Sequence, residues 1–92
     1  MSFAAKVVVY LTNSCPYCVR AKMLLDKKGV AYEVVDVAGN DAKRAWLAQA
    51  TGRRTVPQIF INDKPIGGCD DLYALESRGK LDPMLEQAPA GA

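Results

Sequence analysis

The feature that most constrains the fold is an uninterrupted apolar run, Val7–Leu11, which a short polar turn separates from a helical pattern. A run of this length fits a buried strand, which we predict over Lys6–Thr12, and is far too short to span a membrane. The turn is Thr12-Asn13-Ser14, and Gly29 closes the helix. The apolar residues at helical spacing are Val19, Met23 and Leu24, with Ala21 and Leu25 beside them. A buried strand that leads directly into a helix is typical of α/β domains.

The middle of the chain predicts a second strand and a second helix. The strand covers Val30–Val37, where β-branched residues alternate with Glu33 and Asp36, and Gly39 and Asn40 end it. The helix covers Asp41–Ala50 and is capped by Gly52. Its predicted buried side consists of Trp46, Leu47 and Ala50.

The last third of the chain predicts a hairpin followed by two helices. Gln58–Ile61 and Lys64–Gly67 are strands joined by the turn Asn62-Asp63, and the proline within the second of them suits only an edge strand. One helix begins at Cys69 or Asp70 and runs to a Gly79 cap. A final short helix is expected with Asp82 as its cap and Pro83 as its first residue.

This order of elements predicts one α/β domain over residues 1–92, with a frayed tail at 88–92. A parallel β-α-β unit extended by an antiparallel hairpin gives a four-stranded mixed sheet flanked by helices on both faces.

Composition narrows the classes of function. The net charge is only +2 and charged residues make up 24% of the chain without basic or acidic runs, so we expect neither nucleic acid nor a membrane as partner. The start of the chain has no leader pattern, and three cysteines do not form a secreted disulfide framework, so a cytoplasmic location is expected. The absence of histidine excludes Cys-His and Ser-His nucleophile pairs.

The stretch Cys15-Pro16-Tyr17-Cys18 lies where the first strand meets the first helix. Proline favours the first helical position, which makes Cys15 the N-cap. Its sulfur would then accept the free backbone N–H of Cys18 and lie at the positive end of the helix dipole, and both effects favour the thiolate. Cys18 lies on the same helical face and can attack a mixed disulfide formed on Cys15. The alternative, half of a zinc site, lacks ligands, so no metal is expected.

Three motifs together resemble the glutaredoxins, most closely the bacterial dithiol type. They are Cys15 to Cys18, Thr55-Val56-Pro57 and the run from Gly67 to Asp71. The resemblance covers Lys6 to about Leu85, and it implies the thioredoxin fold with glutathione as co-substrate and no tightly bound cofactor. It also implies that Pro57 is cis and faces Cys15, and that the Val56 backbone pairs with glutathione like an added strand.

The same resemblance implies the remaining ligand contacts. The γ-glutamyl end of glutathione would lie against the helix start, and Gln49 would reach the glycine end. Many relatives carry a lysine where this chain has Thr12, and Arg54 is the favoured replacement for its charge, ahead of Arg53, Arg20 and Lys22. The full predicted glutathione site is Tyr17, Thr55, Val56, Pro57, Gly68, Cys69, Asp70, Asp71, Gln49 and Arg54.

Three residues admit a structural interpretation. Cys69, beside a glycine pair and a helix start, is predicted to be a small buried residue rather than a second reactive thiol. Met23 and Trp46 are predicted to be core residues because their spacing fits helix faces.

The predicted function is a glutathione-dependent thiol–disulfide oxidoreductase that acts as a monomer on disulfide-containing or glutathionylated proteins. Two alternatives are a donor reduced by a flavoprotein reductase, which the glycine-rich third motif disfavours, and an iron–sulfur cluster carrier, which Pro16 and Tyr17 disfavour.

Overall fold

The computed structural model describes residues 3–12 and 15–89, which form four strands and four helices. In chain order these are β1 Val7–Leu11, α1 Pro16–Lys28, β2 Glu33–Asp36, α2 Asp41–Thr51, β3 Gln58–Ile61, β4 Lys64–Gly67, α3 Cys69–Ser77 and α4 Leu81–Glu86. The predicted turn residues Asn13 and Ser14 and the end of the predicted tail, 90–92, lie outside the described residues.

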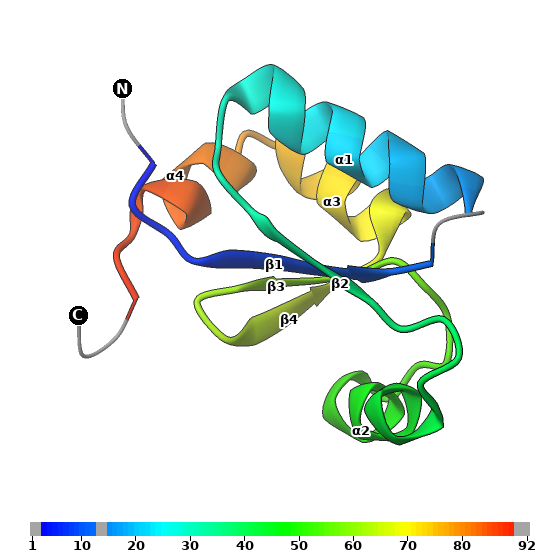
Figure 1. Ribbon diagram of the computed structural model, residues 1–92. Coiled ribbons are helices and arrows are strands. Elements are labelled where there is room, and N and C mark those ends of the chain that lie inside the picture. Colours follow the sequence, from blue (N-terminus) through cyan, green and yellow to red (C-terminus); the bar gives the residue numbers. More distant parts are fainter. Residues whose placement is uncertain (1–2, 13–14, 90–92) are drawn as a thin grey trace.

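The strands form one mixed sheet in the order β2-β1-β3-β4. β1 runs parallel to β2 and antiparallel to β3, and β4 completes the hairpin with β3. Figure 1 shows α1, α3 and α4 on one side of the sheet and α2 on the other. The predicted fold class, a four-stranded mixed sheet with helices on both faces, is therefore confirmed.

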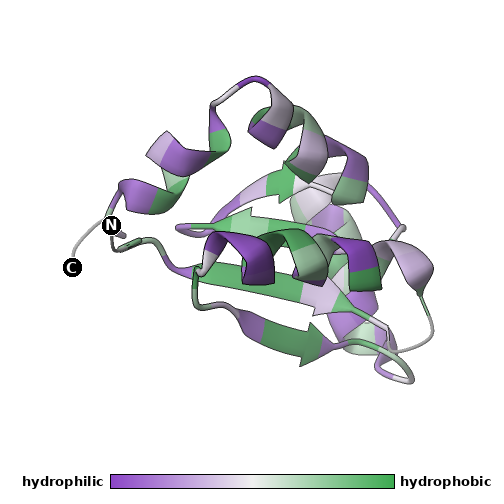
Figure 2. Ribbon diagram, turned by 90° about the horizontal axis from the view of Figure 1, so that it is seen from above, coloured by the Kyte–Doolittle hydropathy of each residue, from purple (hydrophilic) through white to green (hydrophobic). Residues whose placement is uncertain are grey.

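Alternation along the strands divides the apolar side chains between the two faces. Val7, Val9 and Leu11 point into the main core beneath α1 and α3, whereas Val8 and Phe60 form a smaller cluster with Leu47 of α2. Figure 2 shows largely hydrophobic strands between helices whose exposed sides are hydrophilic. No helix among the described residues is long and apolar enough to cross a membrane.

The predicted buried faces of the two longer helices are wrong in part. α1 buries Cys18, Ala21, Leu24 and Leu25, while Val19 and Met23 are exposed. Each helical residue turns by about 100°, so Met23 lies almost opposite Ala21.

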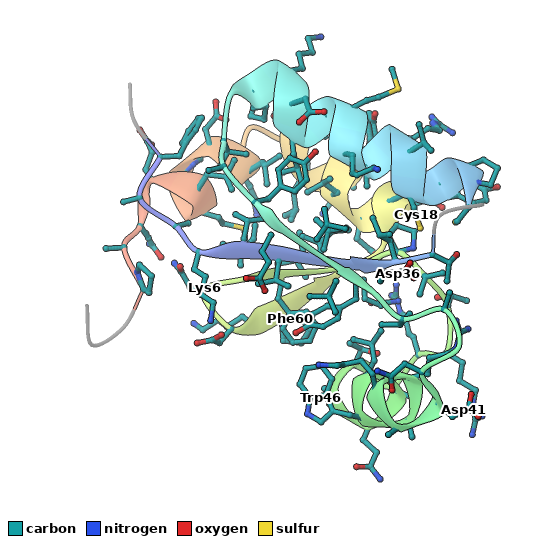
Figure 3. The ribbon with its side chains drawn as sticks, in the orientation of Figure 1. Lys6, Cys18, Asp36, Asp41, Trp46 and Phe60 are labelled. Carbon is teal, nitrogen blue, oxygen red and sulfur yellow. The ribbon has the colours of Figure 1, made fainter. Side chains whose placement is uncertain are left out.

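On α2 only Leu47 is buried, and Ala50 is exposed. Trp46 is 46% exposed, because it lies at the rim of the smaller cluster and stacks on Phe60 with ring centroids 5.9 Å apart (Figure 3).

Two predicted boundaries also differ from the structure. The second strand is shorter than Val30–Val37, because only the residues of β2 pair with β1, although Val30 and Val37 are both buried. The last helix begins at Leu81 with Lys80 at the N-cap, so Asp82 is not the cap. The helix therefore starts two residues earlier than predicted, and Asp82, now inside its first turn, pairs with Lys28 of α1.

Lys28 joins the C-terminal ends of α1 and α3 to α4. Its side chain is only 11% exposed, and Nζ lies 2.6 Å from Glu76 Oε1 and 2.7 Å from Asp82 Oδ1. Hydrogen bonds to Asp82 and then to Glu76 raise the pKa of Lys28, so the ammonium stays charged throughout the neutral range. This network fixes the end of the molecule opposite the cysteines.

We expect Lys28→Met to lower the free energy of unfolding by about 1 to 2 kcal/mol, because two carboxylates then face each other without a counter-ion. Urea denaturation at neutral pH measures this loss. Lys6→Met is the matched control, since the Lys6–Asp63 pair is exposed and should contribute less than about 0.5 kcal/mol. Equal losses in the two variants would show that burial of Lys28 does not strengthen its pairs.

Candidate active site

Cys15 occupies the N-cap of α1, as predicted. Its backbone is extended (φ −92°, ψ 117°), Pro16 stands at the first helical position, and the Cys15 carbonyl accepts the N–H of Val19 at 3.2 Å. The Cys15 N–H donates back to the Thr12 carbonyl at 3.4 Å. The strand-to-helix turn therefore holds the first thiol at the positive end of the helix.

The thiol of Cys15 does not make the hydrogen bond that the sequence predicts. Its Sγ makes no cap bond to the helix but donates to the Val56 carbonyl at 3.6 Å. The protonated thiol has a hydrogen to donate, and the carbonyl is the acceptor that the opposite loop presents to it. The expected bond from the Cys18 N–H to the Cys15 sulfur is therefore absent. The Cys15 thiol is instead hydrogen-bonded to the opposite loop.

Cys18 lies in the first turn of α1 (Figure 3). Its side chain is buried, with only 1% of the residue exposed. Burial first, and then a hydrogen bond to Cys15, raise the pKa of the Cys18 thiol to about 11, although Lys22 opposes the shift. Cys18 therefore stays protonated near neutral pH while Cys15 lies at the surface of the site. The two thiols are close neighbours with different access to solvent.

The loop that faces Cys15 contains a cis peptide bond between Val56 and Pro57, which confirms the expectation drawn from the family resemblance. Val56 packs against both apolar clusters, so the loop is held from both faces of the sheet. Behind it the fully buried Gln58 donates through Nε2 to the Thr55 carbonyl at 2.9 Å and to Thr55 Oγ1 at 3.3 Å.

The glycine pair at the end of β4 forms the other side of the site. Gly67 has φ +113°, and any side chain there would overlap the Asp71 carboxylate. Asp71 Oδ2 accepts the Gly68 N–H at 2.9 Å and pairs with Arg53 Nη1 at 2.7 Å. The Gly68 hydrogen bond and then Arg53 lower the pKa of Asp71, so it remains a carboxylate. This bridge connects the start of α3 to the segment before Thr55.

These elements enclose a groove of about 260 Å³ that combines eight of the ten predicted ligand residues with Arg53. Its lining consists of Tyr17, Arg53, Thr55, Val56, Pro57, Gly68, Cys69, Asp70 and Asp71. The other two predicted residues, Gln49 and Arg54, line a separate cavity of about 640 Å³ along α2, together with Asp41 and Arg44.

Cys69 is the first residue of α3 and is 5% exposed. Burial raises the pKa of its thiol, with Arg20 acting in the opposite direction. The structure thus agrees with the prediction of a small buried residue, whose contribution to the groove comes from the start of the helix. Among the described residues no group of three or more His, Cys, Asp and Glu side chains is arranged to hold a metal ion.

Comparison with known proteins decides the family. The glutaredoxin family model matches residues 7–66. The chain is 55% identical over 82 residues to glutaredoxin 3 of Escherichia coli K12, covering 89% of this chain and 99% of that protein. It is 56% identical over 86 residues to a probable glutaredoxin of Synechocystis, covering 92% of this chain and 79% of that one. The chain belongs to the glutaredoxin family.

A solved structure agrees with this placement. The crystal structure of the buckwheat glutaredoxin–glutathione complex superposes with a TM-score of 0.84 at 43% identity, over 88% of this chain and 76% of the buckwheat chain. As a glutaredoxin, this protein is a thiol–disulfide oxidoreductase, and the close pair Cys15 and Cys18 is its dithiol.

One site residue was ranked too low from the sequence and another was not singled out. Arg53 was named as a candidate behind Arg54, yet it is Arg53 that lines the groove and pairs with Asp71, because neighbouring arginines in a loop cannot be told apart without the backbone. Gln58 is the one polar residue in a strand that is otherwise Ile59, Phe60 and Ile61, and this break in the apolar pattern was the available signal.

We expect iodoacetamide at pH 8 to modify Cys15 and to leave Cys18 and Cys69 unmodified in the reduced protein, since burial both shields these two thiols and raises their pKa. Peptide mapping by mass spectrometry locates the label. Cys15→Ser should take up almost none on the same timescale. Labelling of Cys18 as fast as that of Cys15 would contradict the assigned difference between the thiols.

Proposed function

We propose that this glutaredoxin is a cytoplasmic monomer that uses glutathione to reduce glutathione mixed disulfides and protein disulfides. The observation that carries the proposal is a groove lined by Val56 and the start of α3, with the Cys15 thiol 3.6 Å from the Val56 carbonyl. The buckwheat relative, which shares the fold, is described as a complex with glutathione. The partners are therefore glutathione and proteins that carry disulfides or glutathionyl groups.

The groove offers a complementary group for each part of glutathione. The Val56 backbone is available for strand-like pairing with the cysteinyl residue of the ligand. Backbone N–H groups at the start of α3 suit the γ-glutamyl carboxylate, and the exposed Asp70 carboxylate suits the ammonium. Asp71 already binds Gly68 and Arg53, so we assign it the support of this wall.

The glycine carboxylate of glutathione requires a cation. Arg53 lies in the groove, whereas Gln49 and Arg54 line the cavity along α2. We propose that Gln49 and Arg54 reach the glycine end from that side, and that Arg53 adds positive charge where many relatives have the lysine that Thr12 replaces.

Reduction of a glutathione mixed disulfide needs only Cys15. Its thiolate attacks the glutathione sulfur, the protein thiolate leaves and takes up a proton, and Cys15 becomes glutathionylated. A second glutathione thiolate then attacks the sulfur of the bound glutathione, releasing glutathione disulfide and restoring Cys15. When Cys15 is ionised it no longer donates to Val56, so that carbonyl becomes free to accept from the ligand.

Reduction of a protein disulfide uses both thiols. Cys15 attacks one sulfur and the other leaves as a thiolate that takes up a proton. Cys18 then loses its proton and attacks Cys15, which releases the second protein thiol and leaves a Cys15–Cys18 disulfide. Two glutathione molecules reduce that disulfide and become glutathione disulfide. Because its pKa is raised to about 11, Cys18 cannot compete with Cys15 for the first attack.

We expect Cys15→Ser to lose both activities and Cys18→Ser to lose only the reduction of protein disulfides. A serine hydroxyl is neither ionised nor a good leaving group, whereas the mixed-disulfide route needs Cys15 and external glutathione alone. Coupled assays with glutathione and glutathione reductase measure both activities. Residual turnover of Cys15→Ser above about a tenth of wild type would contradict the assigned roles.

The same pair of assays can fail in informative ways. If Cys18→Ser keeps both activities, Cys18 is not the resolving thiol. If it loses both, glutathione does not reach the mixed disulfide on Cys15 and the groove is misassigned. A Cys15–Cys69 disulfide found by peptide mapping in oxidised Cys18→Ser would contradict the structural role of Cys69.

A further inference from the structure

Gln58 is a fully buried polar side chain directly behind the active-site loop. It begins β3, and alternation along the strand places it on the same face as Phe60, beneath Thr55 and Val56. Its Nε2 donates to the Thr55 carbonyl at 2.9 Å and to Thr55 Oγ1 at 3.3 Å. Both contacts lie in the loop and neither lies in the groove.

The orientation of the Gln58 amide follows from these contacts. The Thr55 carbonyl only accepts, so the amide atom that faces it must be the nitrogen. This leaves Oε1 buried without a hydrogen-bond partner among residues 3–12 and 15–89. A buried acceptor left unpaired is unfavourable, and a methionine of similar size would fill the space without it. Packing alone therefore does not account for a glutamine at this position.

What Gln58 provides is the orientation of one peptide group. The Thr55 carbonyl and the Val56 N–H belong to the same planar trans peptide, in which oxygen and hydrogen point in opposite directions. Gln58 draws the carbonyl toward the buried side, and so turns the Val56 N–H away from it. On the far side of Val56, its carbonyl lies 3.6 Å from Cys15 Sγ. The buried Gln58 amide thus sets the direction of the Val56 N–H, while the Val56 carbonyl contacts the Cys15 thiol.

We propose that Gln58 is a positioning residue that holds the Val56 N–H ready to pair with the cysteinyl backbone of bound glutathione. This inference rests on the proposed function, since it concerns how the groove binds the same ligand. Gln58 touches neither glutathione nor the thiols, because its side chain is fully buried behind Thr55. Its contribution is to binding, and the chemistry of Cys15 is independent of it.

The test is Gln58→Met, which keeps the volume and removes the donor. The KM for a small glutathione mixed disulfide should rise by about tenfold, while kcat and the rate of Cys15 alkylation by iodoacetamide stay within about twofold. Ile61→Val is the matched control: it perturbs packing in the same strand at the end away from the loop, and its KM should match wild type.

The outcomes separate the inference from the proposed function. An unchanged KM in Gln58→Met, with wild type active, overturns the inference alone. A wild type that does not reduce the mixed disulfide overturns both. If kcat, the rate of Cys15 alkylation and the melting temperature of Gln58→Met all fall together, Gln58 has only a structural role. That result also overturns the inference.

A measurement on wild type keeps the inference testable if the variants do not fold. In ¹⁵N spectra of the reduced protein, the Gln58 side-chain amide protons should exchange slowly with solvent and the Val56 amide should shift on glutathione binding. Rapid exchange of the Gln58 amide, or a Val56 amide that glutathione leaves unmoved, would overturn the inference.

Discussion

The contact between the Cys15 thiol and the Val56 carbonyl, 3.6 Å across, is the interaction on which the site depends. Cys15 follows β1 at the start of α1, and Val56 lies just before β3. Antiparallel pairing places the end of β1 beside the start of β3, which brings the two residues together at the same end of the sheet. The cis bond to Pro57 and the amide of Gln58 fix the loop, while Pro16 fixes the turn. A thiol at a helix start thereby faces a backbone edge that a peptide ligand can extend.

The different surroundings of the two thiols explain how they divide the reaction. Cys15 lies where solvent and substrates reach it, whereas Cys18 is enclosed between α1 and the sheet and carries a raised pKa. A buried thiol is a poor first nucleophile, yet it becomes an effective one when a disulfide forms on its neighbour, because the attack is then intramolecular. The same helix supplies both roles through residues three positions apart.

Much of the fold could be predicted from the sequence, because its patterns are local. Val7–Leu11 reads as a buried strand, the Asn62-Asp63 turn defines the hairpin, and the order of elements limits the topology. Trp46 and Met23 were misassigned to the core, since helical spacing shows that residues share a face but not which face meets the sheet. The bounds of β2 depended on its pairing with β1, and Asp82 pairs with Lys28 instead of capping α4; both are long-range contacts.

The site was predictable where a motif marks a backbone position and less so where side chains choose their partners. Gly67 and Gly68 were recognisable as part of the glycine-rich motif, and the structure supplies the reason: the Asp71 carboxylate leaves no room for a side chain at Gly67. The partner of Asp71, Arg53 rather than its neighbour, and the orientation of the Cys15 thiol both follow from how the loop and helix meet in space. Neither the choice of Arg53 nor the orientation of the thiol can be read from residue spacing.

The most direct measurement is amide chemical-shift mapping of Cys18→Ser before and after its Cys15 thiol is converted to the mixed disulfide with glutathione. The account predicts that the adduct forms and that the largest shifts, beyond those beside Cys15, fall on the amides of Val56, Cys69 and Asp70. Shifts confined to α1, or an adduct that leaves these three amides unmoved, would contradict the claim that this groove holds glutathione over Cys15.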